Sequence, residues 1–202
     1  MKKKFIIMTA TAVVSLMTTS CGTSKPGTSS RVDSMIGQKA ELDPVMEYAE
    51  LKPSVREFGT AQHFKEATAK NLATAQARGA YASSIRSAII AACEEIGVNL
   101  SMYAGDDESS KTVSDQSSES NDLVQSIANE IVENTHPVKY SRYMLPNKQW
   151  KYYVCIEYMG LPDQMAEKVE EKLKEKISSS DRTKLEERHD RFRQRIMNKL
   201  NQ

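Results

Sequence analysis

Cysteine and histidine, which often act in catalysis or bind metals, are scarce in this chain of 202 residues. It has three Cys and three His, and His63, His136 and His189 fall in separate predicted elements without the spacing of metal ligands. No motif places a nucleophile beside a base. We therefore predict no catalytic residue, no metal site and no cofactor, and we expect a protein that is not an enzyme.

Cysteine is also too scarce for a disulfide framework. Besides Cys21, the only thiols are Cys93 and Cys155, and an oxidising compartment permits a bridge between them without requiring one. Cys93 falls near the buried face of a predicted helix, where a thiol packs as a small hydrophobe. A thiol enzyme that uses Cys155 is one alternative function, but the candidate base, His136, is predicted at the far end of the partner strand.

An excess of charge of one sign is absent. The chain has 28 Lys and Arg against 27 Asp and Glu, a formal charge of +1, and removal of three N-terminal Lys would leave −2. This balance gives no reason to expect nucleic acid as a partner. One local exception is the basic end formed by Arg191, Arg193, Arg195 and Lys199. A solvated helix end, phospholipid headgroups or an acidic protein partner would each explain it.

Long apolar runs are absent except near residue 1. Lys2, Lys3 and Lys4 precede the apolar run Phe5–Met17, which is too short to span a bilayer as a stable helix. We interpret residues 1–20 as a bacterial signal peptide. The stretch Thr18-Thr19-Ser20-Cys21-Gly22 resembles the lipobox at which bacterial lipoproteins are cleaved and acylated.

Cys21 is the lipidation site in this interpretation. Acyl chains such as palmitate contribute about 0.8 kcal/mol per buried CH₂, so they would anchor the chain to a membrane without a transmembrane helix. Residues 21–43 form a predicted tether, because residues 22–31 are almost all Ser, Thr, Gly and Pro. Gly22 rather than Asp after the Cys favours, by resemblance to lipoprotein sorting rules, the periplasmic face of the outer membrane. Plain secretion with Cys21 unmodified is the alternative.

The longest predicted element is an Ala-rich helix from His63 to Ile96. Its small side chains raise helix propensity and allow a sheet or a second helix to approach closely. Gly97 is expected to end it, because glycine adopts the left-handed conformation of helix C-termini. Positions expected to be buried recur every three or four residues. They are Phe64, Thr68, Leu72, Ala75, Gly79, Ala82, Ile85, Ile89, Ala92 and Ile96.

Shorter elements surround this helix. The acidic, Ser-rich stretch 105–122 is predicted to be a mobile loop whose acids lack the ordered spacing of a calcium site. Before and after the long helix we expect a helix at Pro44–Leu51 and strands at Pro53–Phe58 and from Val98 to Tyr103. A second helix is expected beside the first, from Leu123 to near Asn134, followed by a hairpin of Val138–Leu145 with Trp150–Tyr158. Charged helices after Asp163 and Ser180 are expected to dock on the core or to pair with another subunit.

The predicted hairpin concentrates most of the aromatic residues. A two-residue turn at Asn147-Lys148 would pair Tyr143 with Tyr152 on the core side. The other side would then carry Tyr140 by Cys155 and Arg142 by Tyr153. Tyr, Trp and Arg dominate interface energetics, so Tyr140, Arg142 and Tyr153 form the candidate interaction patch.

Together these elements predict an α+β fold, with a long Ala-rich helix and a second helix packed on one face of a small antiparallel sheet, and a C-terminal helical extension. The expected division is a signal peptide at 1–20, a lipidated tether at 21–43, the α+β domain at 44–160 with its acidic loop 105–122, and a charged helical extension at 161–202.

The order of several segments resembles the twenty-kilodalton lipoprotein antigen family of bacteria. These segments are Phe58-Gly59, the run Ala75-Gln76-Ala77-Arg78-Gly79-Ala80-Tyr81-Ala82, Thr135 to Arg142, and Trp150-Lys151-Tyr152-Tyr153-Val154-Cys155-Ile156, within residues 54–158. The resemblance implies an α+β domain without a known active site. We expect an outer-membrane lipoprotein that acts in structure or protein interaction, with envelope proteins or itself as partner. A binding module for a cell-wall or glycan ligand is the alternative.

Overall fold

The computed structural model describes residues 42–100 and 113–202, which belong to one compact unit. The expected signal peptide, the lipidation site Cys21, the tether up to residue 41 and the first part of the acidic loop lie outside the described residues. Within the described ranges, no helix combines the length and apolar character that a membrane span requires.

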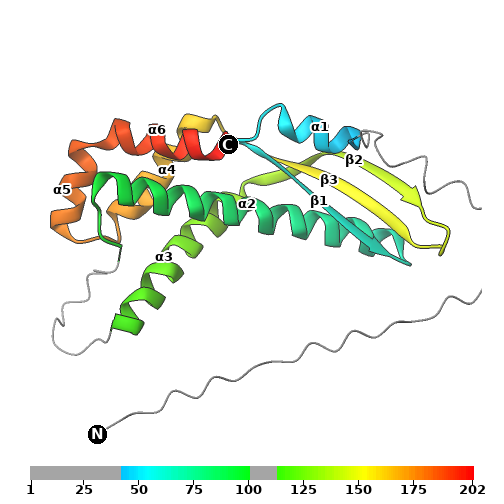
Figure 1. The fold of residues 1–202 in the computed structure, drawn as a ribbon, viewed down its shortest axis with the longest axis horizontal. Coiled ribbons are helices and arrows are strands. Elements are labelled where there is room, and N and C mark those ends of the chain that lie inside the picture. The colour runs from blue at the N-terminus through cyan, green and yellow to red at the C-terminus, as the bar shows by residue number, and fades with distance from the viewer. Residues whose placement is uncertain (1–41, 101–112) are drawn as a thin grey trace, which may run out of the picture. The chain divides into compact units, whose positions relative to one another are not determined.

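The described part of the chain is α+β, with six helices and three strands (Figure 1). This architecture confirms the predicted fold class. The elements are α1 (Pro44–Glu50), β1 (Arg56–His63), α2 (Glu66–Ile96), α3 (Val113–Glu133), β2 (Thr135–Met144), β3 (Trp150–Tyr158), α4 (Pro162–Lys174), α5 (Ser179–Glu187) and α6 (His189–Leu200).

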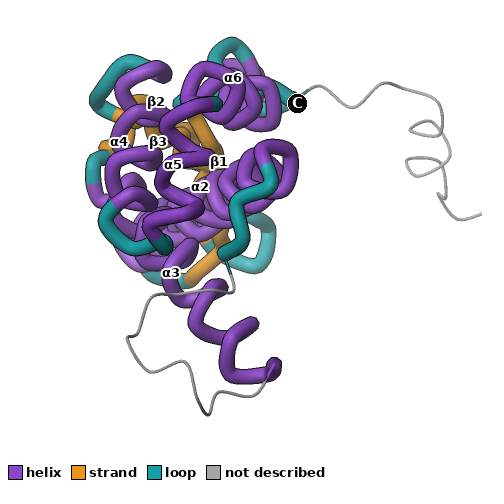
Figure 2. Tube along the Cα trace, turned by 90° about the vertical axis from the view of Figure 1, so that its left-hand side faces the viewer, coloured by secondary structure: helices purple, strands orange, loops and turns teal. Residues whose placement is uncertain are grey.

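Helix α2 is the element on which the others pack. Its first half lies against the sheet and its second half lies among the other helices (Figure 1). Seen nearly end-on, α2 has α6 on one side and α3 on the other (Figure 2). Gly97 ends the helix with φ 71°, which confirms the predicted left-handed stop. The predicted packing of the second helix beside the first is also confirmed.

The buried face of α2 matches the prediction only in the second half of the helix. Ile85 and Ile89 are buried as expected, whereas Phe64, before the helix, and Leu72 are exposed. In the first half the buried positions are Ala69, Ala73 and Ala77. The reason is the close approach of β1, where a Cβ on Gly59 would lie 2.2 Å from the Ala73 carbonyl oxygen. No side chain therefore fits at position 59, and the strand backbone lies directly against the Ala73–Ala77 turn of the helix.

The sheet has the antiparallel order β1-β3-β2. The expected strand Pro53–Phe58 is wrong in its bounds, because β1 begins at Arg56 and continues through Gly59 to His63. The expected strand after Gly97 is also wrong over 98–100, which contain a turn and no strand. The rest of that prediction lies outside the described residues.

The hairpin register differs from the prediction by one residue. Tyr143 pairs with Lys151, not with Tyr152. The cause is the turn, in which Leu145 N donates to Gln149 O (2.8 Å) and Lys148 adopts a positive φ of 63°. A type I turn followed by a left-handed residue makes a three-residue loop in place of two. This extra residue inverts the faces assigned to residues 139–144, and a register shift between Pro137 and Lys139 ends the inversion.

Helix α1, predicted correctly at Pro44, covers the sheet face opposite α2 (Figure 1). Val45 and Ala49 pack there on Cys155. The buried Arg56 guanidinium fastens the helix to β1 by donating to the Tyr48 carbonyl oxygen (3.1 Å) and to the Tyr48 hydroxyl (2.9 Å). Both faces of the central strand are therefore covered.

The helices after residue 161 dock on the core, one of the two arrangements left open above. Phe192, Ile196 and Leu200 on α6 belong to the same hydrophobic cluster as α2. Buried Glu170 of α4 pairs with Lys174 (2.6 Å) and accepts a hydrogen bond from Arg193 of α6. Residues 161–202 are thus part of the domain core and not a projecting tail.

Helix α3 begins at Val113, inside the stretch 105–122 that was predicted to be a loop. That part of the prediction is wrong. Residues 113–122 contain neither Gly nor Pro, so nothing in them stops a helix whose later turns are packed against α2. Val124, Ala128 and Ile131 supply that packing.

Candidate interaction surfaces

The three residues of the predicted interaction patch do not share one face. Tyr140 pairs with Val154, and Arg142 pairs with Tyr152, so both lie on the α2 side of the sheet. Tyr153 lies on the α1 side. The structure therefore brings Tyr140 and Arg142 together and separates Tyr153 from them, because the register is shifted by one residue.

On the α2 side, the exposed hairpin residues contact the start of α2. Arg142 donates a hydrogen bond to Glu66, which also accepts one from the Tyr152 hydroxyl (2.5 Å). These bonds, first from Tyr152 and then from Arg142, lower the pKa of Glu66. The Tyr140 ring stacks on Tyr152 with centroids 6.2 Å apart, and Lys70 Nζ lies 4.8 Å from its centre.

On the α1 side, Asp43 joins the beginning of the described chain to the hairpin. Its Oδ1 caps α1 by accepting from Val45 N (2.8 Å). Its Oδ2 accepts from the Ser141 hydroxyl (2.7 Å) and from the Tyr143 hydroxyl (2.8 Å). Burial acts to raise the pKa of Asp43, but these hydrogen bonds outweigh it and the pKa is lowered. Tyr153 packs edge-on to Tyr143.

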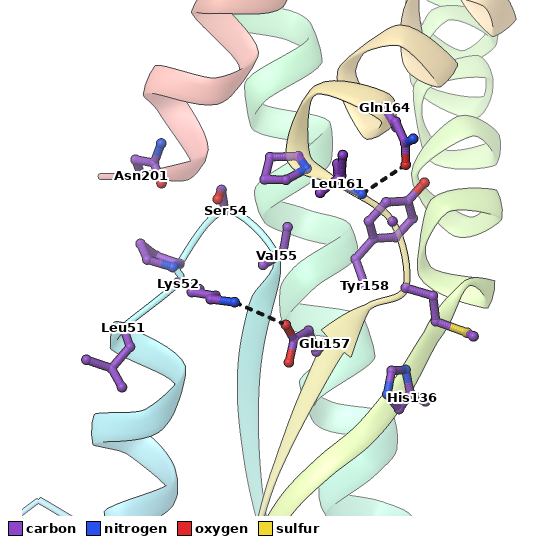
Figure 3. A pocket seen from close by; sticks show the side chains of 14 residues that line it. Leu51, Lys52, Ser54, Val55, His136, Glu157, Tyr158, Leu161, Gln164 and Asn201 are labelled. Atoms are coloured by element: carbon purple, nitrogen blue, oxygen red, sulfur yellow. Dashed lines mark hydrogen bonds and ion pairs between the residues drawn. The ribbon is translucent and has the colours of Figure 1, made fainter.

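A cleft of about 750 Å³ lies at the opposite end of the strands, and sequence reasoning missed it (Figure 3). Six chain segments meet there: the α1–β1 connection, the start of β2, the end of β3, the β3–α4 connection, the first turn of α4 and the residue after α6. Three large apolar side chains at its rim are mostly exposed, Leu51 (73%), Met159 (73%) and Leu161 (64%). We call these three residues the apolar rim.

Polar groups of both signs line the same cleft (Figure 3). Lys52 Nζ lies 3.9 Å from Glu157, which also accepts from Arg56 Nε (3.1 Å). Leu161 N donates to the Gln164 side chain (3.0 Å), which orders the entry to α4. An open cleft with an apolar rim and a few oriented polar groups is typical of a binding site for a protein segment.

Cys93 and Cys155 are buried free thiols, with exposed fractions of 1% and 0%. Burial is the main cause that raises the pKa of Cys93 to about 12 and that of Cys155 to about 11. His136 pairs with Glu157 in the sheet, away from Cys155, which pairs with Lys139. This burial supports the packing interpretation of Cys93, and it places Cys155 out of reach of solvent as well.

The three arginines of the basic end are paired with acids of the same domain, whereas Lys199 Nζ donates to the Gln202 side-chain oxygen (3.3 Å). Arg191 Nε lies 2.8 Å from Glu95 of α2, and Arg195 Nε lies 3.1 Å from the same carboxylate. Arg193 pairs with Glu170, as described above. These arginines bind α6 to α2 and α4, so they are not a free basic surface.

Among the residues that the structure describes, no group of three His, Cys, Asp or Glu side chains is placed to hold a metal ion. Comparisons of this chain with protein-family models, with curated proteins and with solved structures give no match.

Proposed function

We propose that this chain is a lipid-anchored protein of a bacterial cell envelope, acylated at Cys21 and held at the periplasmic face of the outer membrane. Its domain binds another envelope protein through the apolar rim of the cleft. The function is structural or interactive and involves no catalysis. The resemblance to the twenty-kilodalton lipoprotein antigen family remains part of this proposal.

The observation that carries the proposal is the apolar rim. Leu51 comes from the α1–β1 connection, and Met159 and Leu161 come from the β3–α4 connection, yet all three surround one cleft. Single exposed apolar residues are common on protein surfaces, but a cluster around a cleft marks an interaction site. The nearby charges of Lys52 and Glu157 supply the polar contacts that surround an interface core.

The cleft is tested by site-directed photo-cross-linking in intact cells. A photoreactive phenylalanine analogue at Leu161 is expected to capture a discrete protein, and the same analogue at Glu186, an exposed position on α5, is not. Leu51→Ser combined with Met159→Ser is expected to abolish capture. Both residues are exposed, so the free energy of unfolding should change by about 0.5 kcal/mol or less per site.

Leu72→Ser is the matched control, because Leu72 is an exposed apolar residue of α2 that does not line the cleft. It should leave the cross-links unchanged. Captured copies of the same chain would identify self-association in place of a different partner. If the rim variants still sediment with purified peptidoglycan, this result would instead support the glycan-binding alternative. It would refute the role of the rim.

The anchor has a separate test. Cells supplied with labelled palmitate should incorporate it into the wild-type chain and not into Cys21→Ser. The Cys155→Ala variant is the control and should be labelled normally. A wild-type chain that never takes up the label, or a Cys21→Ser chain that does, would refute lipidation at this residue.

A further inference from the structure

The end of the sheet that carries the hairpin turn combines cations, aromatic rings and exposed apolar side chains. We define the hairpin end as residues 42–43, 60–70 and 139–153. We propose that the hairpin end docks on an anionic phospholipid surface, so that the domain stands on the membrane with its cleft directed away from it. This inference extends the proposed function and rests on its lipid anchor for the tether that holds the domain near the bilayer.

The first argument is the charge of the hairpin end. It holds six cations but only two carboxylates, Asp43 and Glu66, in a chain whose charges otherwise nearly cancel. Both carboxylates already accept hydrogen bonds from hairpin side chains. The cations are Lys65, Lys70, Lys139, Arg142, Lys148 and Lys151. Each Lys or Arg near an anionic lipid surface contributes about 1 kcal/mol of attraction.

The second argument is the aromatic residues among these cations. Arg142 lies 5.7 Å from the Trp150 ring centre, and Lys151 lies 4.9 Å from that of Tyr153. Lys70 is placed in the same way over Tyr140. Tyr and Trp with Lys and Arg are the residues that concentrate at membrane–water interfaces, where a ring contacts the acyl boundary and the cation contacts the headgroups.

The third argument is a row of apolar side chains across the strand ends. His63 of β1 and Met144 of β2 both pair with Trp150 of β3, so Met144 lies beside Trp150 on one side, and Phe64 directly follows the residue on its other side. Phe64 is 66% exposed and Met144 is 55% exposed. Exposed apolar residues bordered by Lys match the composition of segments that insert shallowly into a bilayer surface.

The hairpin end lies where the chain enters the domain, and this position favours a lipid surface as the partner that covers it. The described chain begins at Leu42, and the next residue, Asp43, bonds to Tyr143 of the hairpin. The twenty residues between Cys21 and Leu42 reach at most roughly 65 Å. An anchor on Cys21 therefore keeps the hairpin end at a high effective concentration at the bilayer, so weak contacts suffice for docking.

The cleft lies at the other end of the same strand. β3 runs from Trp150 at the hairpin end to Tyr158 in the cleft, nine residues or roughly 25 Å. A domain that rests on its hairpin end therefore presents the apolar rim away from the lipid, where an envelope protein can reach it.

Trp150 is the single Trp of the chain, so its fluorescence reports the hairpin end alone. Residues 21–202, which carry the complete domain core, are coupled through the Cys21 thiol to a maleimide lipid in vesicles. The coupling is selective because Cys93 and Cys155 are buried. Vesicles of phosphatidylcholine with or without phosphatidylglycerol also carry a nitroxide on their headgroups. We expect strong quenching of Trp150 only in the anionic vesicles, and its loss at 1 M salt.

The variant that tests the surface reverses three hairpin charges, Lys65→Glu, Lys148→Glu and Lys151→Glu. It should lower the ratio of docked to undocked molecules on the order of 100-fold, since each Lys accounts for about a factor of five. The matched control reverses Lys176, Arg182 and Lys199, three exposed cations outside the hairpin end. It changes the net charge equally and should be quenched like the wild type.

The inference is overturned if anionic vesicles quench Trp150 no more than neutral ones, or if the hairpin and control triples behave alike. A photo-cross-linker at Tyr143 that captures a discrete protein in cells, with no quenching on vesicles, would assign this surface to a protein partner instead. Because coupling supplies the anchor chemically, failure of docking is distinguished from failure of acylation, which palmitate labelling measures.

Discussion

Gly59 of β1 lies against the backbone of α2 so closely that an added Cβ would stand 2.2 Å from the Ala73 carbonyl oxygen and 2.4 Å from the Ala77 nitrogen. Neither atom belongs to a flexible side chain. Gly59→Ala is therefore expected to force the strand and the helix apart and to lower the free energy of unfolding by about 3 kcal/mol. Urea unfolding followed by circular dichroism measures this loss.

Gly79 on the exposed side of α2 is the matched control for Gly59. A Cβ there would meet no atom within 4 Å. Gly79→Ala should stabilise the protein by about 0.5–1 kcal/mol, because Gly is a poor helix former. Equal effects at the two sites would contradict the close strand–helix contact.

Arg56 controls access to Cys155, because it fastens α1 over that thiol. Hydrogen bonds to a charged group contribute about 1.5–3 kcal/mol each, so Arg56→Ala should open α1 locally. In a Cys21→Ser background we expect maleimide labelling of Cys155 to become at least tenfold faster, which corresponds to about 1.4 kcal/mol. Mass spectrometry assigns the labelled thiol.

Cys93 is the internal control of the same experiment, because it is buried on α2 in a hydrophobic cluster separate from the one that α1 forms with Cys155. Its labelling rate should stay low in Arg56→Ala. Arg56→Lys keeps the charge but loses the planar fork, so it should be intermediate. A parallel increase at both thiols would mean that the whole domain opens, and the proposed local role of Arg56 would be wrong.

Glu170 should make the domain sensitive to acid. Burial acts to raise the pKa of this carboxyl, but Lys174 and Arg193 outweigh burial and hold the pKa below its ordinary value of 4.5. Its contribution to stability is therefore complete above pH 4.5 and is lost as the pH falls through the lowered pKa. Glu170→Gln should cost about 3 kcal/mol at pH 7, with a smaller difference from the wild type at pH 3.

Unfolding in urea at a series of pH values measures this dependence. Glu171→Gln, at the exposed neighbouring position, should change the free energy of unfolding by about 0.5 kcal/mol or less. If the wild type and Glu170→Gln lose stability in parallel between pH 7 and pH 3, the ion pairs of Glu170 are not the cause of the acid sensitivity.

Phe192 tests whether the C-terminal helices are part of the core. It is buried in the cluster shared with α2, so Phe192→Ala should lower the free energy of unfolding by about 3–5 kcal/mol. Gln194→Ala, on the exposed side of α6, is the control. A small effect at Phe192, together with cooperative unfolding of the rest, would indicate a dispensable extension.

The sequence predicted a helix end correctly where a single residue type determines it. Pro44 begins α1, and Gly97 ends α2, because each residue type restricts or permits a specific backbone angle. The hairpin faces were predicted wrongly because the pairing depends on Lys148. Lys rarely adopts the left-handed conformation, so its presence did not indicate one at position 148. A Gly at the same position would have indicated the three-residue loop.

Features that depend on tertiary contact were not predictable in this way. The pattern that made Leu72 a buried position followed the larger apolar residues, whereas β1 approaches the first half of α2 over Ala69, Ala73 and Ala77. The cleft escaped notice because Leu51, Met159 and Leu161 lie far apart in the sequence or in connections without periodicity. The pairing of β1 with β3, which places Arg56 opposite Glu157 and lets Tyr158 N donate to Val55 O (2.8 Å), brings these connections together.

Leu200, two residues from the end of the chain, completes the core around α2. Protein synthesis adds roughly 5–20 residues per second, so α2 is made about 5–20 s before the last residue that covers it. During that time its apolar face has no permanent partner from α6. The packed core can therefore be complete only after Leu200 has been synthesised, and until then part of the apolar face of α2 stays uncovered.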